Sequence, residues 1–216
     1  MDNLQEFISK LREDFMNGSL LEKDIQEDPF AQFKCWLNEA VEAKVPEPQA
    51  MNLATASPEG KPSARIVYLR EFQNNDFWFY TNYGSRKGQQ LSINQQACLT
   101  FFWPELERQV RIEGIVKKAS SAESDAYFNA RPYDSKVGAW ASNQSHVLSS
   151  RAELEERVSE LQKKYTPENI TRPPHWGGYV LQAEYYEFWQ GRKSRLHDRI
   201  AYAFDGKTWH ISRLSP

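Results

Sequence analysis

The sequence has few cysteines, no long apolar run and no marked excess of charge of either sign. Its two cysteines, Cys35 and Cys98, form no CxxC pattern, which argues against a disulfide framework and against a zinc finger. The longest apolar run, Ala97 to Trp103, is far shorter than the roughly 18 residues that span a bilayer. The first residues contain no apolar signal core either, so we expect a cytoplasmic protein that does not interact with membranes.

Charge and composition narrow the class of protein further. The 27 basic residues are outnumbered by 29 acidic ones, whereas dedicated nucleic-acid binders usually carry a basic excess, so we expect no nucleic-acid partner. Aromatic residues make up 13% of the chain, a content that disordered chains lack and that can build a core or line a pocket for a flat ligand.

Several well-known catalytic and binding motifs are missing. The chain has no GxGxxG, no GxxxxGK[ST], no HExxH and no GxSxG, and its four histidines show no metal-ligand spacing. We therefore expect no metal site, and the sequence offers no support for catalysis by a protein nucleophile.

The spacing of apolar and turn residues predicts alternating strands and helices. Helices are predicted over 3–16, from Pro29 to before Pro46, from Ser85 onward, in two pieces over 121–140 broken at Arg131-Pro132, and over 151–164. Strands are predicted over 51–56, 63–69, 76–81, 97–103, 109–118, 178–188, 199–204 and 208–212. About six to eight strands with helices between them indicate an α+β fold, a closed or split antiparallel barrel in a single domain over 1–216.

Basic residues recur beside hydroxyl and amide residues. Arg65 and Arg70 lie five apart on one predicted strand and would point to opposite faces if that strand were regular. Arg86 and Lys87 stand at a predicted helix start, where backbone N–H groups and the helix dipole favour a phosphate. Taken alone, this short motif is more often a solvated turn.

Two further groups of residues admit both a functional and a structural interpretation. Tyr127, Arg131 and Ser135 would share one face if the helix continued across Pro132, and their guanidinium and hydroxyl groups suit a phosphate; the alternative is an exposed helix face. Residues 185–199 interleave aromatic and basic side chains, as a nucleic-acid strip would, but nearby acidic residues dilute the charge. His197, between two arginines, is either structural or in contact with an anionic ligand.

Taken in order, these segments resemble the pyridoxamine 5′-phosphate oxidase family. Glu187-Phe188-Trp189-Gln190, followed after four residues by Arg195-Leu196-His197-Asp198-Arg199, resembles the signature of that family. The remaining matches are collinear with it: Arg65-Ile66-Val67, Phe79-Tyr80-Thr81-Asn82, Gly84-Ser85-Arg86-Lys87, RQVRIEG up to Gly114, Gln144-Ser145 and Arg213-Leu214-Ser215-Pro216. The resemblance covers roughly residues 10–216.

The resemblance implies a fold, a cofactor and a reaction. The implied fold is an FMN-binding split β-barrel, antiparallel and Greek-key-like with peripheral helices, in a homodimer with two sites at the subunit interface. The implied reaction oxidises pyridoxamine 5′-phosphate or pyridoxine 5′-phosphate to pyridoxal 5′-phosphate, with O2 as the electron acceptor. Because the cofactor carries the redox chemistry, the protein need only supply position and electrostatics, which fits the missing catalytic motifs.

The resemblance also implies a role for each matched residue. Implied FMN-binding residues are Arg65, Ile66, Val67, Tyr68, Leu69, Arg70, Tyr80, Thr81, Arg86, Lys87, Gln109, Gln144, Ser145, Trp189 and Arg199. Implied substrate-binding residues are Arg12, Arg70, Tyr127, Arg131, Ser135, Arg195, Leu196 and His197. Arg195 and His197 would be catalytic, closing over the pyridine ring opposite the flavin. Residues 1–20 would form a helix that acts as a lid.

The chain departs from the family pattern at two positions. Many members have Lys where this chain has Arg70; charge is retained, but a planar fork replaces a point charge, so we expect phosphate binding to survive. Phe15 stands where the family has a tyrosine in its N-terminal segment, and it lacks the hydroxyl. Two alternatives stay open: a split-barrel protein that holds FMN or pyridoxal phosphate without turnover, and a flavin oxidoreductase with another substrate.

Overall fold

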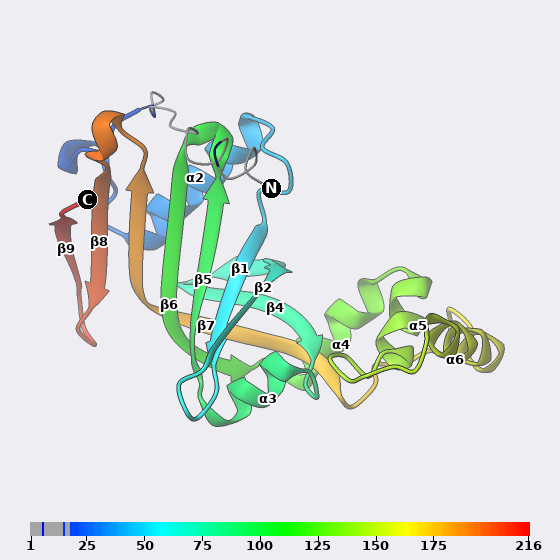
Figure 1. The fold of residues 1–216 in the computed structure, drawn as a ribbon. Coiled ribbons are helices and arrows are strands. Elements are labelled where there is room, and N and C mark those ends of the chain that lie inside the picture. The colour runs from blue at the N-terminus through cyan, green and yellow to red at the C-terminus, as the bar shows by residue number, and fades with distance from the viewer. Residues whose placement is uncertain (1–5, 7–14, 16–17) are drawn as a thin grey trace. The chain divides into compact units, whose positions relative to one another are not determined.

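The computed structural model describes Glu6, Phe15 and residues 18–216 of the chain. The predicted helix over 3–16 and the predicted ligand Arg12 lie outside the described residues. Nine strands form one sheet in the order β2-β1-β5-β6-β7-β4-β3, and β8 joins β7 and β9 (Figure 1). The strands are β1 (Ala50–Ala56), β2 (Pro62–Tyr68), β3 (Glu71–Gln73), β4 (Asp76–Asn82), β5 (Gln96–Trp103), β6 (Arg108–Lys118), β7 (Trp176–Gln190), β8 (Asp198–Phe204) and β9 (Trp209–Leu214).

The helices occupy the positions that the sequence predicts. The α-helices are α2 (Pro29–Glu42), α3 (Arg86–Ile93), α4 (Ser121–Ala130), α5 (Tyr133–Ala141) and α6 (Arg151–Lys164). Three short 3-10 turns, which the sequence did not predict, are η1 (Glu22–Asp24), η2 (Pro104–Leu106) and η3 (Lys193–Arg195). None of the helices in the described part of the chain is both long and apolar enough to cross a membrane.

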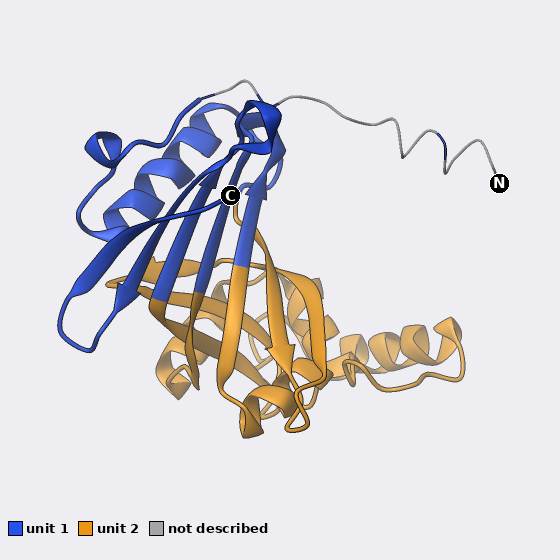
Figure 2. Ribbon diagram, turned by 60° about the vertical axis from the view of Figure 1, so that its left-hand side comes forward, with its two compact units in different colours: residues 1–48, 100–112, 185–216 blue, residues 49–99, 113–184 orange. Residues whose placement is uncertain are grey.

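The chain divides into two compact units (Figure 2). The first comprises residues 1–48, 100–112 and 185–216, and the second comprises residues 49–99 and 113–184. Strands β5, β6 and β7 each contribute residues to both. The expectation of one domain over the whole chain stays a prediction.

In the first unit, Asp28 is the N-cap of helix α2, and its carboxylate accepts the backbone N–H groups of Phe30 and Ala31 at 3.1 and 3.2 Å. Its apolar stripe is buried: Phe33 packs against Phe101 and Trp36 against Phe188, with ring centroids 5.1 and 5.2 Å apart. Large aromatic side chains thus form the core of this unit.

In the second unit, helix α3 starts at the position where the sequence predicts a helix N-terminus that could bind a phosphate. Ser85 is the N-cap and accepts the backbone N–H of Gly88 at 3.3 Å. A Cβ on Gly88 would lie only 2.2 Å from the carbonyl oxygen of Tyr83, so glycine lets this first turn pack directly on the preceding backbone. Lys87 lies in this first turn, directly before Gly88.

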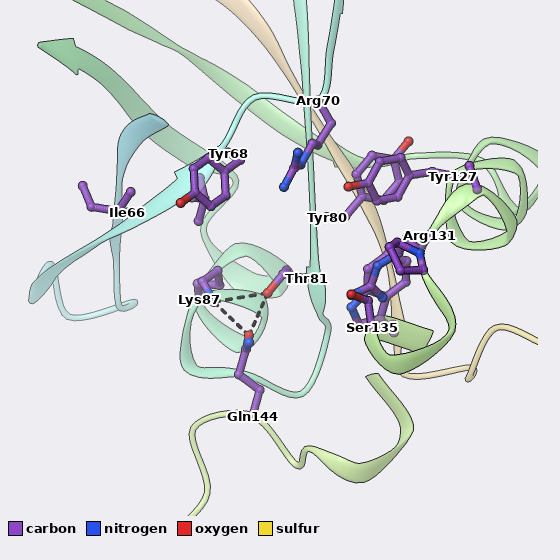
Figure 3. Close-up of a pocket in the computed structure, with 14 residues that line it drawn as sticks. Ile66, Tyr68, Arg70, Tyr80, Thr81, Lys87, Tyr127, Arg131, Ser135 and Gln144 are labelled. Carbon is purple, nitrogen blue, oxygen red and sulfur yellow. Dashed lines mark hydrogen bonds between the residues drawn. The ribbon is translucent and has the colours of Figure 1, made fainter. Parts of the chain in front are cut away.

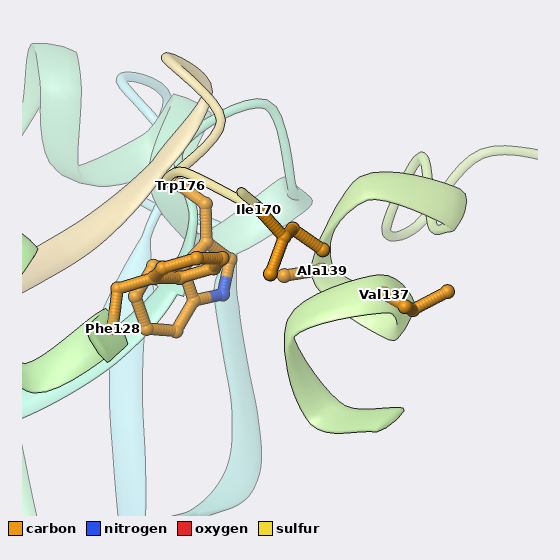
Figure 4. Close-up of a cluster of buried hydrophobic side chains, with 5 residues drawn as sticks. All are labelled: Phe128, Val137, Ala139, Ile170 and Trp176. Atoms are coloured by element: carbon orange, nitrogen blue, oxygen red, sulfur yellow. The ribbon is translucent and has the colours of Figure 1, made fainter. Parts of the chain in front are cut away.

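Helices α4 and α5 are separate, as the break predicted at Arg131-Pro132 requires. Arg131 is the C-cap of α4 with extended backbone, φ −75° and ψ 150°. Behind the break lies a small apolar cluster, whose buried members are drawn in Figure 4: Phe128, Val137, Ala139, Ile170 and Trp176. This cluster anchors both helices next to the start of β7.

Candidate functional site

A cavity of about 490 Å³ lies in the second unit (Figure 3), within the size range of small-molecule sites. It is lined by Ile66, Val67, Tyr68, Arg70, Tyr80, Thr81, Lys87, Tyr127, Ala130, Arg131, Pro132, Ser135, Gln144 and Trp176. The family resemblance assigned all of these except Ala130, Pro132 and Trp176 to cofactor or substrate. The structure therefore gathers most of the predicted residues of this unit around one space.

Lys87 provides a buried positive charge at one side of the cavity. Lys87 is only 9% exposed. Its Nζ atom donates to Gln144 Oε1 at 2.9 Å and to Thr81 Oγ1 at 3.2 Å. The Thr81 hydroxyl in turn donates to Gln144 Oε1 at 2.8 Å, which closes a triangle of hydrogen bonds. Burial, and then repulsion from Arg65, lowers the pKa of Lys87 to about 8. These two hydrogen-bond acceptors are neutral, so the charge at this position suits an anionic ligand.

Arg131 provides a second cation, and it comes from the α4–α5 break. Its guanidinium stacks over Trp176 with Cζ 4.6 Å from the ring centroid. Burial lowers the pKa of Arg131, and its Nη1 atom is buried without a hydrogen-bond partner among the described residues. A single helix carrying Tyr127, Arg131 and Ser135 on one face does not exist, because Pro132 ends α4. The three side chains nevertheless line the same cavity.

Stacked aromatic rings form part of the cavity wall. Tyr80 and Tyr127 lie with centroids 3.7 Å apart and planes 12° apart, and Trp176 stacks 5.7 Å from Tyr80. Burial raises the pKa of Tyr80 to about 12, so its hydroxyl stays protonated. Trp176 was not identified from the sequence, because no periodic or motif signal marks the first residue of β7 as a cavity residue.

Some predicted cofactor residues of this unit do not line the cavity. Arg65 donates instead to Leu53 O, Thr55 Oγ1 and Ser63 Oγ at 3.1, 2.7 and 2.7 Å, which occupies its guanidinium between β1 and β2. Leu69, Arg86 and Ser145 are likewise absent from the lining. Their assignment to FMN stays a prediction.

The remaining predicted residues belong to the first unit. Gln109, Trp189, Arg195, Leu196, His197 and Arg199 are not among the residues that line the cavity. Within their own unit, His197 packs against Trp189 with ring centroids 4.7 Å apart. Burial, followed by repulsion from Arg195, lowers the pKa of His197.

Glu187 is a buried charged residue to which the sequence analysis gave no role. Glu187 is only 3% exposed. Its carboxylate forms ion pairs with Arg199 Nε and Arg111 Nη2, both at 2.9 Å. Removing this carboxylate would leave two guanidiniums side by side, so Glu187 holds Arg199 in place. Alternation along β7 places Glu187 on the face of Tyr185 and Trp189, and that period of two was the available signal.

Comparisons with known proteins agree with this picture. The family described as Pyridoxamine 5′-phosphate oxidase matches residues 37–165, and the Pyridoxine 5′-phosphate oxidase C-terminal dimerisation region matches residues 176–216. A pyridoxine/pyridoxamine 5′-phosphate oxidase of Bordetella pertussis is 54% identical over 210 residues, covering 97% of this chain and 99% of that protein. One of Gloeothece citriformis is 51% identical over 214 residues, covering 99% of this chain and all of that protein.

Solved structures show the same fold. PhzG from Burkholderia lata, solved in complex with tetrahydrophenazine-1-carboxylic acid, aligns with a TM-score of 0.86 and 31% identity over 93% of this chain and 100% of that chain. A pyridoxamine 5′-phosphate oxidase-related, FMN binding protein from Nostoc punctiforme aligns with a TM-score of 0.70 at 18% identity, over 89% of this chain and 100% of that one. The expected fold class, an antiparallel split β-barrel with peripheral helices, is confirmed.

The split-barrel fold, together with relatives more than 50% identical that are named pyridoxine/pyridoxamine 5′-phosphate oxidases, defines the class as a split-barrel oxidoreductase. With family matches over 37–165 and 176–216 and relatives more than 50% identical, the chain belongs to the pyridoxamine 5′-phosphate oxidase family.

Proposed function

We propose that the chain oxidises pyridoxamine 5′-phosphate and pyridoxine 5′-phosphate to pyridoxal 5′-phosphate with FMN as cofactor and O2 as oxidant. For the alcohol, one O2 is reduced to H2O2 as the substrate loses two electrons and two protons. For the amine, one water is also consumed and NH3 is released. Relatives at 51–54% identity carry the name of this activity.

One observation carries the proposal: a single cavity contains two cations that lack an opposite charge among their hydrogen-bond partners. Lys87 Nζ has neutral acceptors, and Arg131 Nη1 is buried without a partner among residues 18–216, Glu6 and Phe15. FMN and the substrate each carry a phosphate ester, so two separate anion sites are required. The residues present therefore fit both groups.

Two different groups of side chains would bind the two ligands. Lys87, Thr81 and Gln144 would bind the FMN phosphate, and Arg131, with Tyr127, Ser135 and Arg70, would bind the substrate phosphate. When bound, FMN supplies the hydride acceptor and transfers the electrons to O2. Binding of both phosphates would contribute to the reaction rate mainly by fixing the substrate in one orientation relative to the cofactor.

We further propose a homodimer whose two sites lie at the subunit interface. The match of residues 176–216 to a dimerisation region supports the dimer. Ile66 lines the cavity and is 64% exposed in the single chain, an apolar surface that a second subunit would cover. Under this proposal the partner completes the wall of the cavity.

Absorbance of the purified protein tests the proposed function. Under anaerobic conditions, pyridoxamine 5′-phosphate should bleach the flavin bands, and admitting air should restore them with release of H2O2. An Arg131→Ala variant should keep the bands but fail to bleach at the same substrate concentration. Flavin bands that persist in the wild-type protein would refute the substrate, and a protein that takes up no FMN would refute the cofactor.

A further inference from the structure

The loop between β7 and β8, residues 191–197, holds the ring of His197 in one plane. The ring packs against Trp189 at 4.7 Å and 43°, and against Phe15 at 5.4 Å and 72°. Phe15 approaches so closely that a Cβ on Gly191 would lie 2.7 Å from its ring. Packing therefore sets the plane of the imidazole and leaves its protonation to its hydrogen bonds.

One hydrogen bond assigns the tautomer of His197. The backbone N–H of Arg192 donates to Nδ1 at 3.1 Å. A ring nitrogen that accepts a hydrogen bond carries no proton, so the proton of the neutral ring lies on Nε2. Burial and the nearby Arg195 lower the pKa of His197, which favours the neutral ring. His197 thus presents an N–H group at Nε2.

The Arg192 side chain is held by the other end of the same loop. Its Nε atom lies 3.6 Å from Asp198 Oδ2, and its Nη1 donates to Gly18 O at 2.9 Å. Asp198 Oδ2 also accepts the backbone N–H of Leu20 at 3.0 Å, and Oδ1 accepts Arg213 Nη1 at 2.9 Å. One carboxylate therefore connects the loop to the segment after Gly18 and to β9.

The loop needs such support because its backbone is unusual. Ser194 and Arg195 both adopt left-handed conformations, with φ of 57° and 62°. Non-glycine residues occupy this region at a cost in free energy, so neighbouring contacts must hold it. Asp198 closes the loop directly after His197 and is placed to do so.

We propose that Asp198 is a positioning residue, which acts through Arg192 to hold His197 as a neutral imidazole with its proton on Nε2, a hydrogen-bond donor. In this state Nε2 has no free lone pair, so His197 can donate to a ligand at this atom but cannot accept a proton from it. The substrate part of this inference rests on the proposed function. The tautomer is a property of the chain alone and is measured without turnover.

Nuclear magnetic resonance of the holoenzyme labelled with 15N-histidine tests the proposal, with the His197 signals assigned by a His197→Gln variant. In the wild-type protein, Nε2 should be protonated and Nδ1 unprotonated. In Asp198→Asn the two ring nitrogens should shift toward each other, as expected for a mixture of tautomers. KM for pyridoxamine 5′-phosphate should rise in proportion to the fraction of the Nε2-protonated ring that is lost, about twofold for an equal mixture, with kcat unchanged.

Asp205→Asn is the matched control. Asp205 is likewise an aspartate that accepts backbone N–H groups, those of Lys207 and Thr208 at 2.8 Å, but it lies in the β8–β9 turn. This variant should leave the His197 signals and KM unchanged. Arg192→Gln keeps the backbone N–H but loses both side-chain contacts, and it should reproduce the mixed tautomer if Asp198→Asn fails to fold.

Two results would overturn the proposal: a proton on Nδ1 in the wild-type protein, or wild-type ring signals in Arg192→Gln and in folded Asp198→Asn. The two claims fail separately. A tautomer that responds as expected in a protein that does not oxidise pyridoxamine 5′-phosphate supports the positioning role and refutes the proposed function.

Discussion

Binding of FMN is expected to take up a proton at Lys87. In the cofactor-free protein, burial and the charge of Arg65 lower the pKa of Lys87 to about 8. A phosphate beside Nζ would supply the missing opposite charge and raise that pKa toward its ordinary value. The second pKa of a phosphate monoester is about 6, so the ligand is a dianion throughout the relevant range.

The size of the effect follows from the two protonation states. With a pKa of about 8, Lys87 is about 90% protonated at pH 7 and about 10% protonated at pH 9. Binding should therefore take up about 0.1 proton at pH 7 and about 0.9 proton at pH 9. Because the bound state holds more protons, raising the pH weakens binding, by about tenfold or ~1.4 kcal/mol from pH 7 to pH 9.

Quenching of FMN fluorescence on titration into the cofactor-free protein measures the affinity at each pH. Calorimetry in two buffers of different ionisation enthalpy counts the protons directly. Lys87→Met should bind FMN more weakly and lose this pH dependence. An affinity that is equal at pH 7 and pH 9, or that falls just as much in Lys87→Met, would refute the reasoning.

Four further variants test other parts of the site and the fold. Arg195→Ala should cut turnover but purify with its flavin absorbance intact, and a colourless protein would contradict the assignment of Arg195 to the substrate. Arg131→Ala should raise KM for pyridoxamine 5′-phosphate about 100-fold in steady-state assays while the Kd for FMN stays unchanged; a matching loss of FMN affinity would argue against separate phosphate sites. Gly88→Ala places a Cβ 2.2 Å from Tyr83 O and should lower the free energy of unfolding by about 2 kcal/mol or more in urea titrations. Gly138→Ala, mid-helix with nothing within 4 Å, should instead raise it by about 0.5–1 kcal/mol.

Periodicity predicted most of the fold because the elements are long enough to show it. Helix α6 has the predicted bounds, and the other predicted helices and strands in the described residues agree to within about two residues at most ends. Strand β3 was missed because its three residues are too few for a pattern. Its pairing with β4 depends on Asn74 and Asn75, which both take left-handed backbone, with φ of 50° and 68°.

Motifs and spacing identified most of the residues that line the cavity. They predicted less well how those residues are arranged in space. A helix start pointed to Arg86 and Lys87 together, yet only Lys87 lines the cavity, because successive helical residues point about 100° apart. Spacing grouped Tyr127, Arg131 and Ser135 only on the condition that the helix continued across Pro132. The chain breaks there, as the sequence also predicted, and the three side chains nevertheless line one cavity. Trp176 was beyond reach of the sequence, since its role depends on how β7 packs beside α4.

The break between α4 and α5 has an evolutionary consequence. Tyr127, Arg131 and Ser135 lie on the two helices and on the connection between them. Lys87, Thr81 and Gln144, by contrast, come from α3, β4 and the loop after α5. An insertion or deletion at the break would displace the first set of side chains and leave the second in place. Selection can therefore alter which anion binds at Arg131 without disturbing the anion site at Lys87. Proteins that descend from one ancestral barrel can then differ in the ligand bound at Arg131 and still bind the same ligand at Lys87.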